Sequence, residues 1–344
     1  MNTQRTFLLN LYLRGVQMRR ITLKDIADAL GLSVSTVSRA LSGKGRISRQ
    51  TIELVERKAR ELGYIPNTIA KGLKTRKTNT IGVIIPDITN PIFPGYARGI
   101  LDAALKQGYQ VFILNFDMSK AKEKDAINSL LSSQVEGLIL TSTKLSRQEL
   151  LELRKRGVPF VVVRKDVRLP GTSFVNVDNI YGGYIATKHL LEIGKKKIAF
   201  IGSRFSGEPA RKRLKGYLKA LKERGIDIRE DIIVEAESSF DGGYRAIQKI
   251  FDRVDGVFAY NDVMAIGVLV FARERGIKLP EELAVIGFDD IPVSSLPIVN
   301  LTTIKQPMYE MGQQAFITLM KLMNDEENVF KIWLKPELVI RGTA

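Results

Sequence analysis

Two groups of side chains in this sequence could do chemistry, and they lie in different parts of the chain. Hydroxyl and basic residues are concentrated between Thr22 and Arg46, where they suit contacts with phosphates and base edges. Carboxylates, amides and arginines follow apolar runs farther along, and such groups can hold adjacent hydroxyls of a ligand in fork geometry. Both patterns indicate binding rather than a chemical reaction.

The residues that several classes of enzyme require are missing. The chain has no cysteine, which excludes disulfides, thiolate catalysis and cysteine-ligated zinc. Its one histidine, His189, follows Gly182–Gly183 in a helical pattern that favours a packing or surface role. Neither glycine-rich phosphate motif, G-x-G-x-x-G or G-x-x-x-x-G-K-[ST], occurs where a strand meets a helix. We therefore predict that the protein is not an enzyme and uses neither a cofactor nor a metal.

The segment from Thr22 to Leu41 predicts two short helices joined by a tight turn. Apolar residues recur at helical spacing in the first helix, at Leu23, Ile26, Ala27 and Leu30. Gly31 can end this helix in a left-handed conformation, and Ser33 can cap the second. The second helix would turn Val34, Val37 and Leu41 inward and leave Ser35, Thr36, Ser38 and Arg39 outside. This pattern is typical of a helix-turn-helix that enters the major groove of DNA, although an ordinary helical hairpin also fits the stretch alone.

The distribution of charge supports binding to nucleic acid. Residues 1–78 contain 16 Lys and Arg against 5 Asp and Glu, so they carry +11 of the total charge of +16. A third helix is expected from Ser48 to Leu62 and would complete a small three-helix domain. Residues 66–78 predict either a basic linker or a short helix that needs a partner to become ordered, because Pro66 stops the third helix and Gly72 weakens the next.

From Thr80 onwards strands and helices alternate, which predicts a doubly wound α/β core. Strands are expected at Ile81–Ile85, Gln110–Leu114, Gly137–Leu140, Pro159–Val163, Ile198–Ile201, Ile232–Glu235, Gly256–Ala259 and Leu283–Ile286. Because each strand is apolar nearly throughout, the sheets should be parallel and covered on both faces. The strand, loop and helix that begin at Ile81 resemble those that begin at Ile198, which predicts two similar lobes.

Ligands of open α/β sheets bind at the carboxyl ends of the strands. The segments at such positions are 87–93, 204–213, 260–262 and 288–290, and they contain carboxylates, amides and arginine beside an aromatic ring. They predict a site for a polyhydroxylated ligand. Several of these residues could instead only cap helices, Asp262 in particular.

Seven motifs resemble in their order those of the LacI/GalR family of bacterial transcription regulators, and the similarity covers essentially everything from Met18 to Arg341. They are ITLKDIADALGLSVSTVSRAL, ELGYIPNTIAKGL, TIGVIIPDITNPIF, VDNIYGGYIATKHLLEIG, AYNDVMAIGVL, VIGFDD and LTTIKQP. The resemblance implies an N-terminal all-α helix-turn-helix domain followed by a two-lobed α/β core like that of periplasmic binding proteins. It also implies a homodimer, or a larger assembly, that binds double-stranded operator DNA of near-palindromic sequence and responds to a small sugar or sugar derivative.

The resemblance also implies roles for individual residues in DNA binding. Phosphate contacts are expected from Thr22, Ser33, Thr51 and Asn67, and base contacts from Val34, Ser35 and Arg39. Arg39 would read a guanine through its bidentate fork, and Leu73 would wedge between base pairs in the minor groove. The rest of the expected DNA-binding set is Thr36, Ser38, Arg46 and Ala70.

In the core, the resemblance implies an effector site between the lobes, formed by Asp87, Asn90, Phe93, Arg213, Asn261, Asp262 and Asp289. Arg213 and Asp289 are the foremost of these residues. The chain departs from the family at two places. Arg164–Lys165–Asp166 stands where the family usually ends a strand with Asp-Arg, which admits an anionic sugar, and the expected pocket aromatic is displaced to Phe240.

The predicted organisation has four parts. Residues 1–18 are an extension or a mis-assigned start, 19–65 the DNA-binding domain, 66–78 a hinge, and 79–344 the core. The N-lobe would comprise about 79–177 and 307–328, and the C-lobe about 178–306 and 329–344, with chain crossings near Asp178, Gln306 and Asn328.

These observations predict a cytoplasmic repressor of carbohydrate utilisation genes that does not associate with a membrane. The effector could either release DNA or promote its binding, since this architecture supports both signs of control. A transport-type sugar-binding protein shares the core fold, but it would need an export signal where residues 1–78 form a basic helical module. A doubly wound enzyme would need a cofactor loop, a thiol or a usable histidine.

Overall fold

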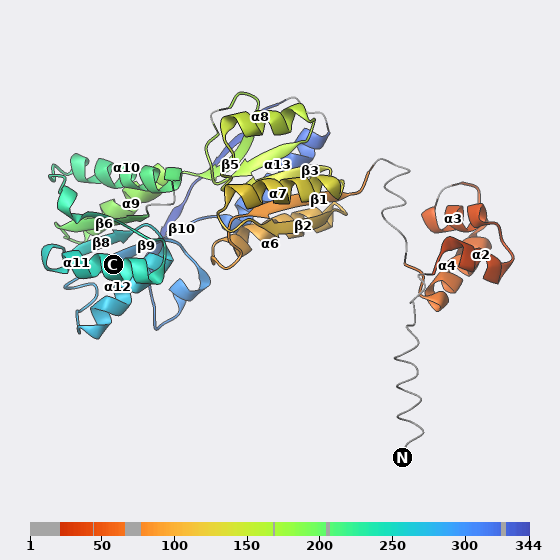
Figure 1. Ribbon diagram of the computed structural model, residues 1–344. Coiled ribbons are helices and arrows are strands. Elements are labelled where there is room, and N and C mark those ends of the chain that lie inside the picture. Colours follow the sequence, from red (N-terminus) through yellow and green to blue (C-terminus); the bar gives the residue numbers. More distant parts are fainter. Residues whose placement is uncertain (1–20, 44, 66–76, 168, 204–206, 325–327) are drawn as a thin grey trace, which may run out of the picture. The chain divides into compact units, whose positions relative to one another are not determined.

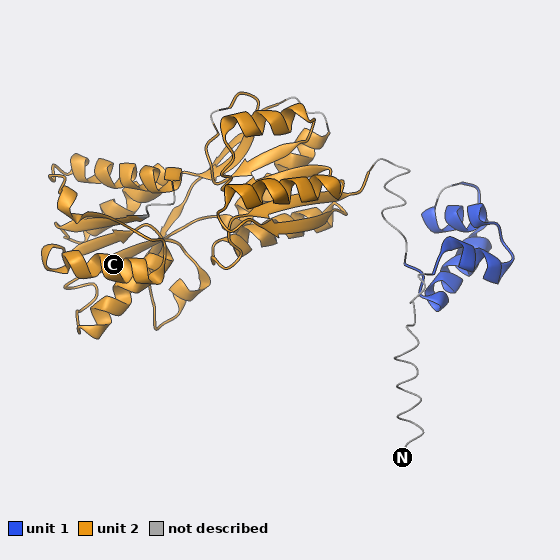
Figure 2. Ribbon diagram, in the orientation of Figure 1, with its two compact units in different colours: residues 1–76 blue, residues 77–344 orange. Residues whose placement is uncertain are grey.

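The structure is a computed structural model that describes residues 21–43, 45–65, 77–167, 169–203, 207–324 and 328–344. The chain divides into two compact units, residues 1–76 and residues 77–344 (Figure 2). The predicted extension and residues 66–76 of the predicted hinge lie outside the described residues, and so do Asn67, Ala70 and Leu73.

The first unit contains the three helices that the sequence predicts, and local signals set their ends. They are α2 (Leu23–Leu30), α3 (Val34–Ser42) and α4 (Arg49–Leu62). Thr22, Ser33 and Ser48 each accept a hydrogen bond from a backbone N–H in the first turn of the helix that follows. A left-handed glycine ends each helix, at Gly31, Gly43 and Gly63.

The core of this unit is small, and it does not include Val34, which the sequence placed there. Its fully buried side chains are Ile26, Ala27, Val37, Ala40, Val55 and Ala59. Val34, which we predicted to turn inward, is 45% exposed. It lies at the first position of α3, and the buried face of this helix runs through Val37 and Ala40 instead. Val34 is therefore available to a partner.

The second unit consists of two lobes, each built on a six-stranded sheet (Figure 1). The first sheet contains β1 (Thr80–Ile85), β2 (Gln110–Asn115), β3 (Gly137–Thr141), β4 (Phe160–Val163), β5 (Ser173–Val177) and β11 (Lys331–Leu334), in the order β11-β5-β4-β3-β1-β2. The second contains β6 (Ile198–Ser203), β7 (Ile233–Ala236), β8 (Gly256–Ala259), β9 (Ala284–Asp289), β10 (Thr302–Lys305) and β12 (Glu337–Val339), in the order β12-β10-β9-β8-β6-β7. All described pairs of neighbouring strands are parallel except β10 with β12.

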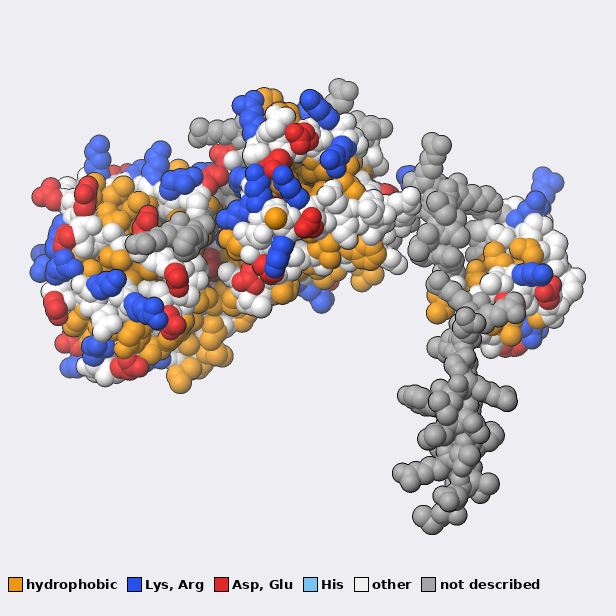
Figure 3. Space-filling model, viewed as in Figure 1, with side chains coloured by type: hydrophobic (Ala, Val, Ile, Leu, Met, Phe, Trp, Pro, Cys, Tyr) orange, Lys and Arg blue, Asp and Glu red, His pale blue; other side chains and the backbone are white. Residues whose placement is uncertain are grey.

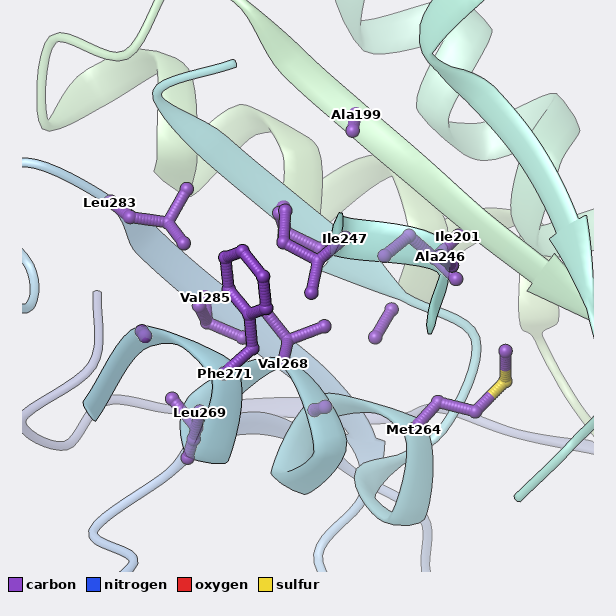
Figure 4. Close-up of a cluster of buried hydrophobic side chains, with 14 of the residues drawn as sticks. Ala199, Ile201, Ala246, Ile247, Met264, Val268, Leu269, Phe271, Leu283 and Val285 are labelled. Atoms are coloured by element: carbon purple, nitrogen blue, oxygen red, sulfur yellow. The ribbon is translucent and has the colours of Figure 1, made fainter. Parts of the chain in front are cut away.

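Helices cover both faces of each sheet, as continuous apolar strands require. The first lobe has α6 (Phe93–Lys106), α7 (Lys120–Ser132), α8 (Arg147–Lys155) and α13 (Met308–Met323). The second has α9 (Asn179–Glu192), α10 (Gly207–Glu223), α11 (Phe240–Ile250) and α12 (Asp262–Glu274). Figure 4 shows one of the resulting cores, in which Val268 and Phe271 of α12 pack against Ile247 and Val285. Among the described helices, none is long and apolar enough to cross a membrane.

The chain passes between the lobes three times, and the third passage differs from the prediction. Helix α13 returns to the first lobe as expected, where it packs against α6 and β3. Strand β11 then pairs with β5, so the predicted crossing near Asn328 is wrong and the chain crosses between Leu334 and Glu337. After this crossing β12 joins the second lobe, antiparallel to β10.

Glycine meets glycine where three pairs of helices cross. The pairs are Gly99 of α6 with Gly312 of α13, Gly183 of α9 with Gly216 of α10, and Gly243 of α11 with Gly267 of α12. A Cβ added to any of these glycines would overlap a backbone carbonyl oxygen of the partner helix. That oxygen always belongs to the residue three positions before the partner's glycine, so each contact is reciprocal. The close approach of these helices therefore depends on glycine on both sides.

Candidate nucleic-acid interface and ligand cavity

The exposed face of α3 carries the side chains for which the family resemblance implies base reading. Val34, Ser35 and Arg39 are exposed, whereas Thr36 and Ser38 are half-buried. Arg39 forms no ion pair within 4 Å with any residue that the structure describes, and its Cδ lies beside Gly45 of the following turn. Its guanidinium can therefore offer a full fork of donors to a partner.

The predicted phosphate ligands of this unit share a position at the start of a helix. Thr22 and Ser33 are the N-caps of α2 and α3, and Thr51 lies in the first turn of α4. The Thr51 hydroxyl lies 2.8 Å from the Ser48 hydroxyl, and the Ser33 hydroxyl lies 2.8 Å from that of Thr36. Helix starts present free N–H groups and a positive dipole end, and both attract phosphate. The structure thus gives this unit three helix N-termini with hydroxyls beside them.

A cavity of about 650 Å³ lies in the second unit and is lined by residues of both lobes. Five of the seven predicted effector residues line it: Asp87, Asn90 and Phe93 from the first lobe, and Asn261 and Asp289 from the second. Each of them follows or ends a strand or begins a helix, as the strand-end rule predicted. The cavity is therefore the place where these side chains meet.

Arg213 does not line the cavity but lies beneath it, only 1% exposed. Its Nε donates to Asn179 Oδ1 at 2.9 Å, one Nη donates to the carbonyl of Tyr260, and Nη1 lies 3.8 Å from Asp289 Oδ1. The guanidinium also lies 3.5 Å from the centroid of the Phe288 ring. Arg213 is thus buried next to Asp289, one of the residues that line the cavity.

Asp262 was predicted to contact the effector, and its position contradicts that prediction more strongly than the position of Arg213 does. It is fully buried, and its carboxylate accepts hydrogen bonds from the Ile291 N–H, the Ser294 hydroxyl and the Thr303 hydroxyl. It does not reach the cavity, because these three donors hold it against β10 and the loop after β9. The cap of α12 is Asn261, whose Oδ1 accepts from the Met264 N–H at 3.0 Å. Asp262 therefore has a structural role.

A buried chain of hydrogen bonds links the lobes below the cavity. The Tyr96 hydroxyl of α6 donates to Gln306 Oε1 at 3.3 Å, and Gln306 Nε2 donates to Asp289 Oδ1 at 2.6 Å. Gln306 stands at the second crossing of the chain, and Asn179, the partner of Arg213, at the first. A ligand that alters Asp289 thus acts on a group that is bonded to Gln306 at the second crossing and lies 3.8 Å from Arg213, which is bonded to Asn179 at the first.

Burial raises the pKa of Asp289 to about 7, although the neighbouring Arg213 lowers it. The folded protein therefore holds on Asp289 a proton that the unfolded chain releases near pH 4.

We expect the stabilisation of the folded state by this proton on Asp289 to be complete below about pH 4 and to disappear as the pH rises through 7. In Asp289→Asn this component is absent, so the difference in free energy of unfolding between wild type and variant should change by roughly 1–4 kcal/mol across that window. Urea denaturation of both proteins at pH 4.5 and 7.5 measures it, and parallel pH profiles would contradict the assignment.

Two lining segments were not predicted: Ser142–Lys144, which follow β3, and Glu237–Ser239, which follow β7. Both missed segments follow strands, so applying the strand-end rule to β3 and β7 would have found them. Glu208 and Arg211 of α10 also line the cavity and lie within the predicted segment 204–213. Phe240, the aromatic residue predicted for the pocket, does not line the cavity and is 38% exposed. Arg164 and Lys165, which mark the departure from the family pattern, both line it.

Comparison with known proteins agrees with both halves of this arrangement. Residues 22–67 match the bacterial regulatory proteins of the lacI family, and residues 187–344 match the periplasmic binding protein-like domain. Catabolite control protein A of Priestia megaterium is 35% identical over 311 residues, which cover 89% of this chain and 93% of that protein. The chain belongs to the LacI family of bacterial transcription regulators.

Solved structures of this family match over nearly the whole chain. The Lac repressor dimer bound to operator and the anti-inducer ONPF has a TM-score of 0.86 at 27% identity, with 94% of this chain and 99% of that chain covered. The transcriptional regulator CelR in complex with cellobiose has a TM-score of 0.71 at 30% identity, with 94% and 100% covered. The LacI-family fold, a helix-turn-helix region and a two-lobed α/β core, is thus confirmed, and with it the role of a DNA-binding transcriptional regulator.

Proposed function

We propose that this LacI-family protein is a cytoplasmic repressor of carbohydrate utilisation genes that binds a near-palindromic operator as a homodimer. A sugar-derived effector in the cavity between the lobes controls the affinity for DNA. The observation that carries the proposal is that one chain combines an unpaired arginine fork on α3 with a polar cavity of about 650 Å³. The Lac repressor complex with operator and the CelR complex with cellobiose support both halves by similarity.

Exposed apolar side chains on the second unit support the homodimer. Leu101 and Leu105 of α6 are 40% and 76% exposed, and Phe112 of the edge strand β2 is 45% exposed. In the second lobe, Leu296 and Ile298 are 48% and 73% exposed. Figure 3 shows apolar side chains gathered along the lower margin of this unit. Apolar groups grouped in this way are typical of surfaces that a partner covers.

The effector is proposed to act through the hydrogen-bond chain of Tyr96, Gln306 and Asp289, which links the lobes. Binding changes the relative position of the lobes, which changes the spacing of the two DNA-binding units in the dimer. Allosteric coupling of this type is commonly 1–3 kcal/mol, a factor of roughly 5–150 in affinity. The sign of control stays open, since either lobe arrangement could favour DNA.

The test is recovery of genomic DNA fragments by the purified protein, with and without a panel of sugars and sugar acids. We expect fragments that share a palindromic site, and we expect one compound to change their recovery. The matched control is the double variant Arg39→Ala with Leu73→Ala, which should lose the common site. Equal recovery by the control would contradict the assignment of DNA binding, and recovery that no compound changes would contradict control by a sugar.

A further inference from the structure

The end of β4 places two cations in succession on the wall of the cavity. Arg164 follows the strand directly with φ +65°, a left-handed conformation that is uncommon for a residue other than glycine. Its backbone N–H donates to the carbonyl of Val175 at 3.0 Å, which ties it to β5. Its guanidinium carbon lies 5.2 Å from the centroid of the Phe93 ring and 5.8 Å from that of Tyr96. The side chain is thus held, half-buried, against two aromatic rings.

The side chain of Lys165, the residue after Arg164, is held by backbone carbonyl groups of a neighbouring loop. Its Nζ donates to the carbonyls of Thr143 and Leu145, at 2.9 and 3.2 Å, and these bonds use two of its three N–H groups. Behind this loop, the fully buried Glu123 accepts a hydrogen bond from the Lys144 N–H at 2.8 Å. The loop that carries Thr143 and Lys144 is therefore anchored from below, and the third N–H of Lys165 remains available to a ligand.

No carboxylate among the described residues forms a direct ion pair with Arg164, although Asp289 attracts it at longer range. Among the described residues, no carboxylate oxygen lies within 4 Å of its guanidinium, whereas Asp289 is paired with Arg213 and Glu208 with Lys212 at 2.6 Å. Arginine keeps its charge at every pH that proteins meet, and a charge withdrawn from water without a counter-ion is unfavourable. An anionic group that binds at Arg164 would relieve this cost.

Other lining groups are suited to hydroxyls. Asn90 Oδ1 accepts from the Ile92 N–H, which leaves its amide N–H groups for a ligand. Asp87 Oδ1 accepts from the Thr89 N–H and hydroxyl, so its second oxygen is without a partner among the residues described. Asn90 and Asp87 belong to the same lobe as Arg164 and line the same cavity. Groups that can bind hydroxyls and a cation without a directly paired carboxylate therefore face one ligand.

We propose that the effector of this protein is an anionic sugar derivative, a sugar acid or a sugar phosphate, whose charged group is bound by Arg164 and Lys165. Its hydroxyls are bound by Asp87 and Asn90. This inference rests on the proposed function, because it names the chemical class of the ligand that occupies the same cavity. The carboxylate of a sugar acid and the phosphate of a sugar phosphate both accept hydrogen bonds from a fork of donors. The experiment below distinguishes the two.

The test is titration calorimetry of the full-length protein with matched compounds: glucose and galactose, their uronic acids, gluconate, and glucose 6-phosphate. We expect an acid or the phosphate ester to bind at least about tenfold more tightly than its neutral parent, the factor that a charge-assisted hydrogen bond supplies. Binding of only the acids identifies a carboxylate ligand, and binding of only the ester a phosphate ligand. Neutral sugars that bind as tightly as the charged compounds, or no binding of any charged compound at about 5 mM, would overturn the proposal.

Variants test whether Arg164 binds the charged group of the ligand. Arg164→Gln should weaken the charged ligand at least about tenfold, and Arg164→Lys less, because lysine keeps the charge and loses the fork. The matched control is Arg245→Gln, which removes an equal charge from an exposed position of α11. Lys165→Gln gives a second measurement should Arg164→Gln fold poorly. Equal affinities of Arg164→Gln and Arg245→Gln would overturn the assignment. Operator binding without ligand is measured separately, so failure of the DNA function is distinguishable from failure of this inference.

Discussion

Replacement of Arg39 by alanine is expected to weaken operator binding by about 30-fold to 10⁴-fold while leaving the fold intact. A bidentate pair of arginine with guanine contributes about 1–3 kcal/mol of discrimination, and a dimer makes two such pairs. Arg39 is exposed and the core side of α3 is formed by Val37 and Ala40, so thermal unfolding should not change. Fluorescence anisotropy with an operator duplex and with an unrelated duplex measures both affinities.

The control must separate base reading from general attraction to phosphate. Arg49→Ala removes the same charge from the first turn of α4, where the side chain is exposed and lies 3.3 Å from Glu53. We expect it to weaken binding to both duplexes slightly and equally, since phosphate contacts carry no sequence information. Arg39→Lys should fall between wild type and Arg39→Ala because it keeps the charge without the fork. If Arg39→Ala lost equal affinity for both duplexes, Arg39 would contact the phosphate backbone of DNA and would not read a base.

The sequence predicted the parts of the fold that local physics decides. Ser33 and Ser48 mark the starts of helices, because their side chains can accept a hydrogen bond from a backbone N–H of the first turn. Gly31 and Gly63 mark the ends of helices, because glycine adopts the left-handed conformation readily. Strands such as β1, buried throughout, are recognisable because an uninterrupted apolar run suits a covered parallel sheet. These features depend on residues within a few positions of one another.

Features that depend on distant partners were not predictable in this way. Strand β11 alternates exposed and half-buried residues, so nothing within it tells which sheet it joins, and pairing with β5 decides the third crossing. Arg213 and Asp262 belong to the predicted effector set, but their environments come from Asn179, Ser294 and Thr303, which the sequence does not connect. In contrast, Arg164 was visible from its departure from the family pattern, and the structure added its aromatic neighbours and its lack of a paired carboxylate.

The reciprocal glycine contacts are the clearest case of a long-range constraint, and Gly99→Ala should reveal it. The new methyl would overlap the carbonyl of Tyr309 on α13, and both helices would have to separate because neither backbone can turn away. Overpacking of a rigid interior costs about 1–3 kcal/mol and occasionally more. We expect Gly99→Ala to lie at or above the upper end of that range, about 3 kcal/mol, since the obstacle is backbone rather than a side chain.

Gly95→Ala is the matched control on the same helix. A Cβ there would meet Cβ and Sδ of Met308 at 3.0 and 3.4 Å, so the thioether can move aside and the Met308 Cβ has to shift by only a few tenths of an ångström. Alanine is also favoured over glycine in helices by about 1 kcal/mol, so this variant should change the free energy of unfolding by less than about 1 kcal/mol in either direction. Urea denaturation of wild type and both variants measures the difference. Equal stability of Gly99→Ala and Gly95→Ala would show that α6 and α13 can move apart freely, and the reciprocal contact would then not be what sets their distance.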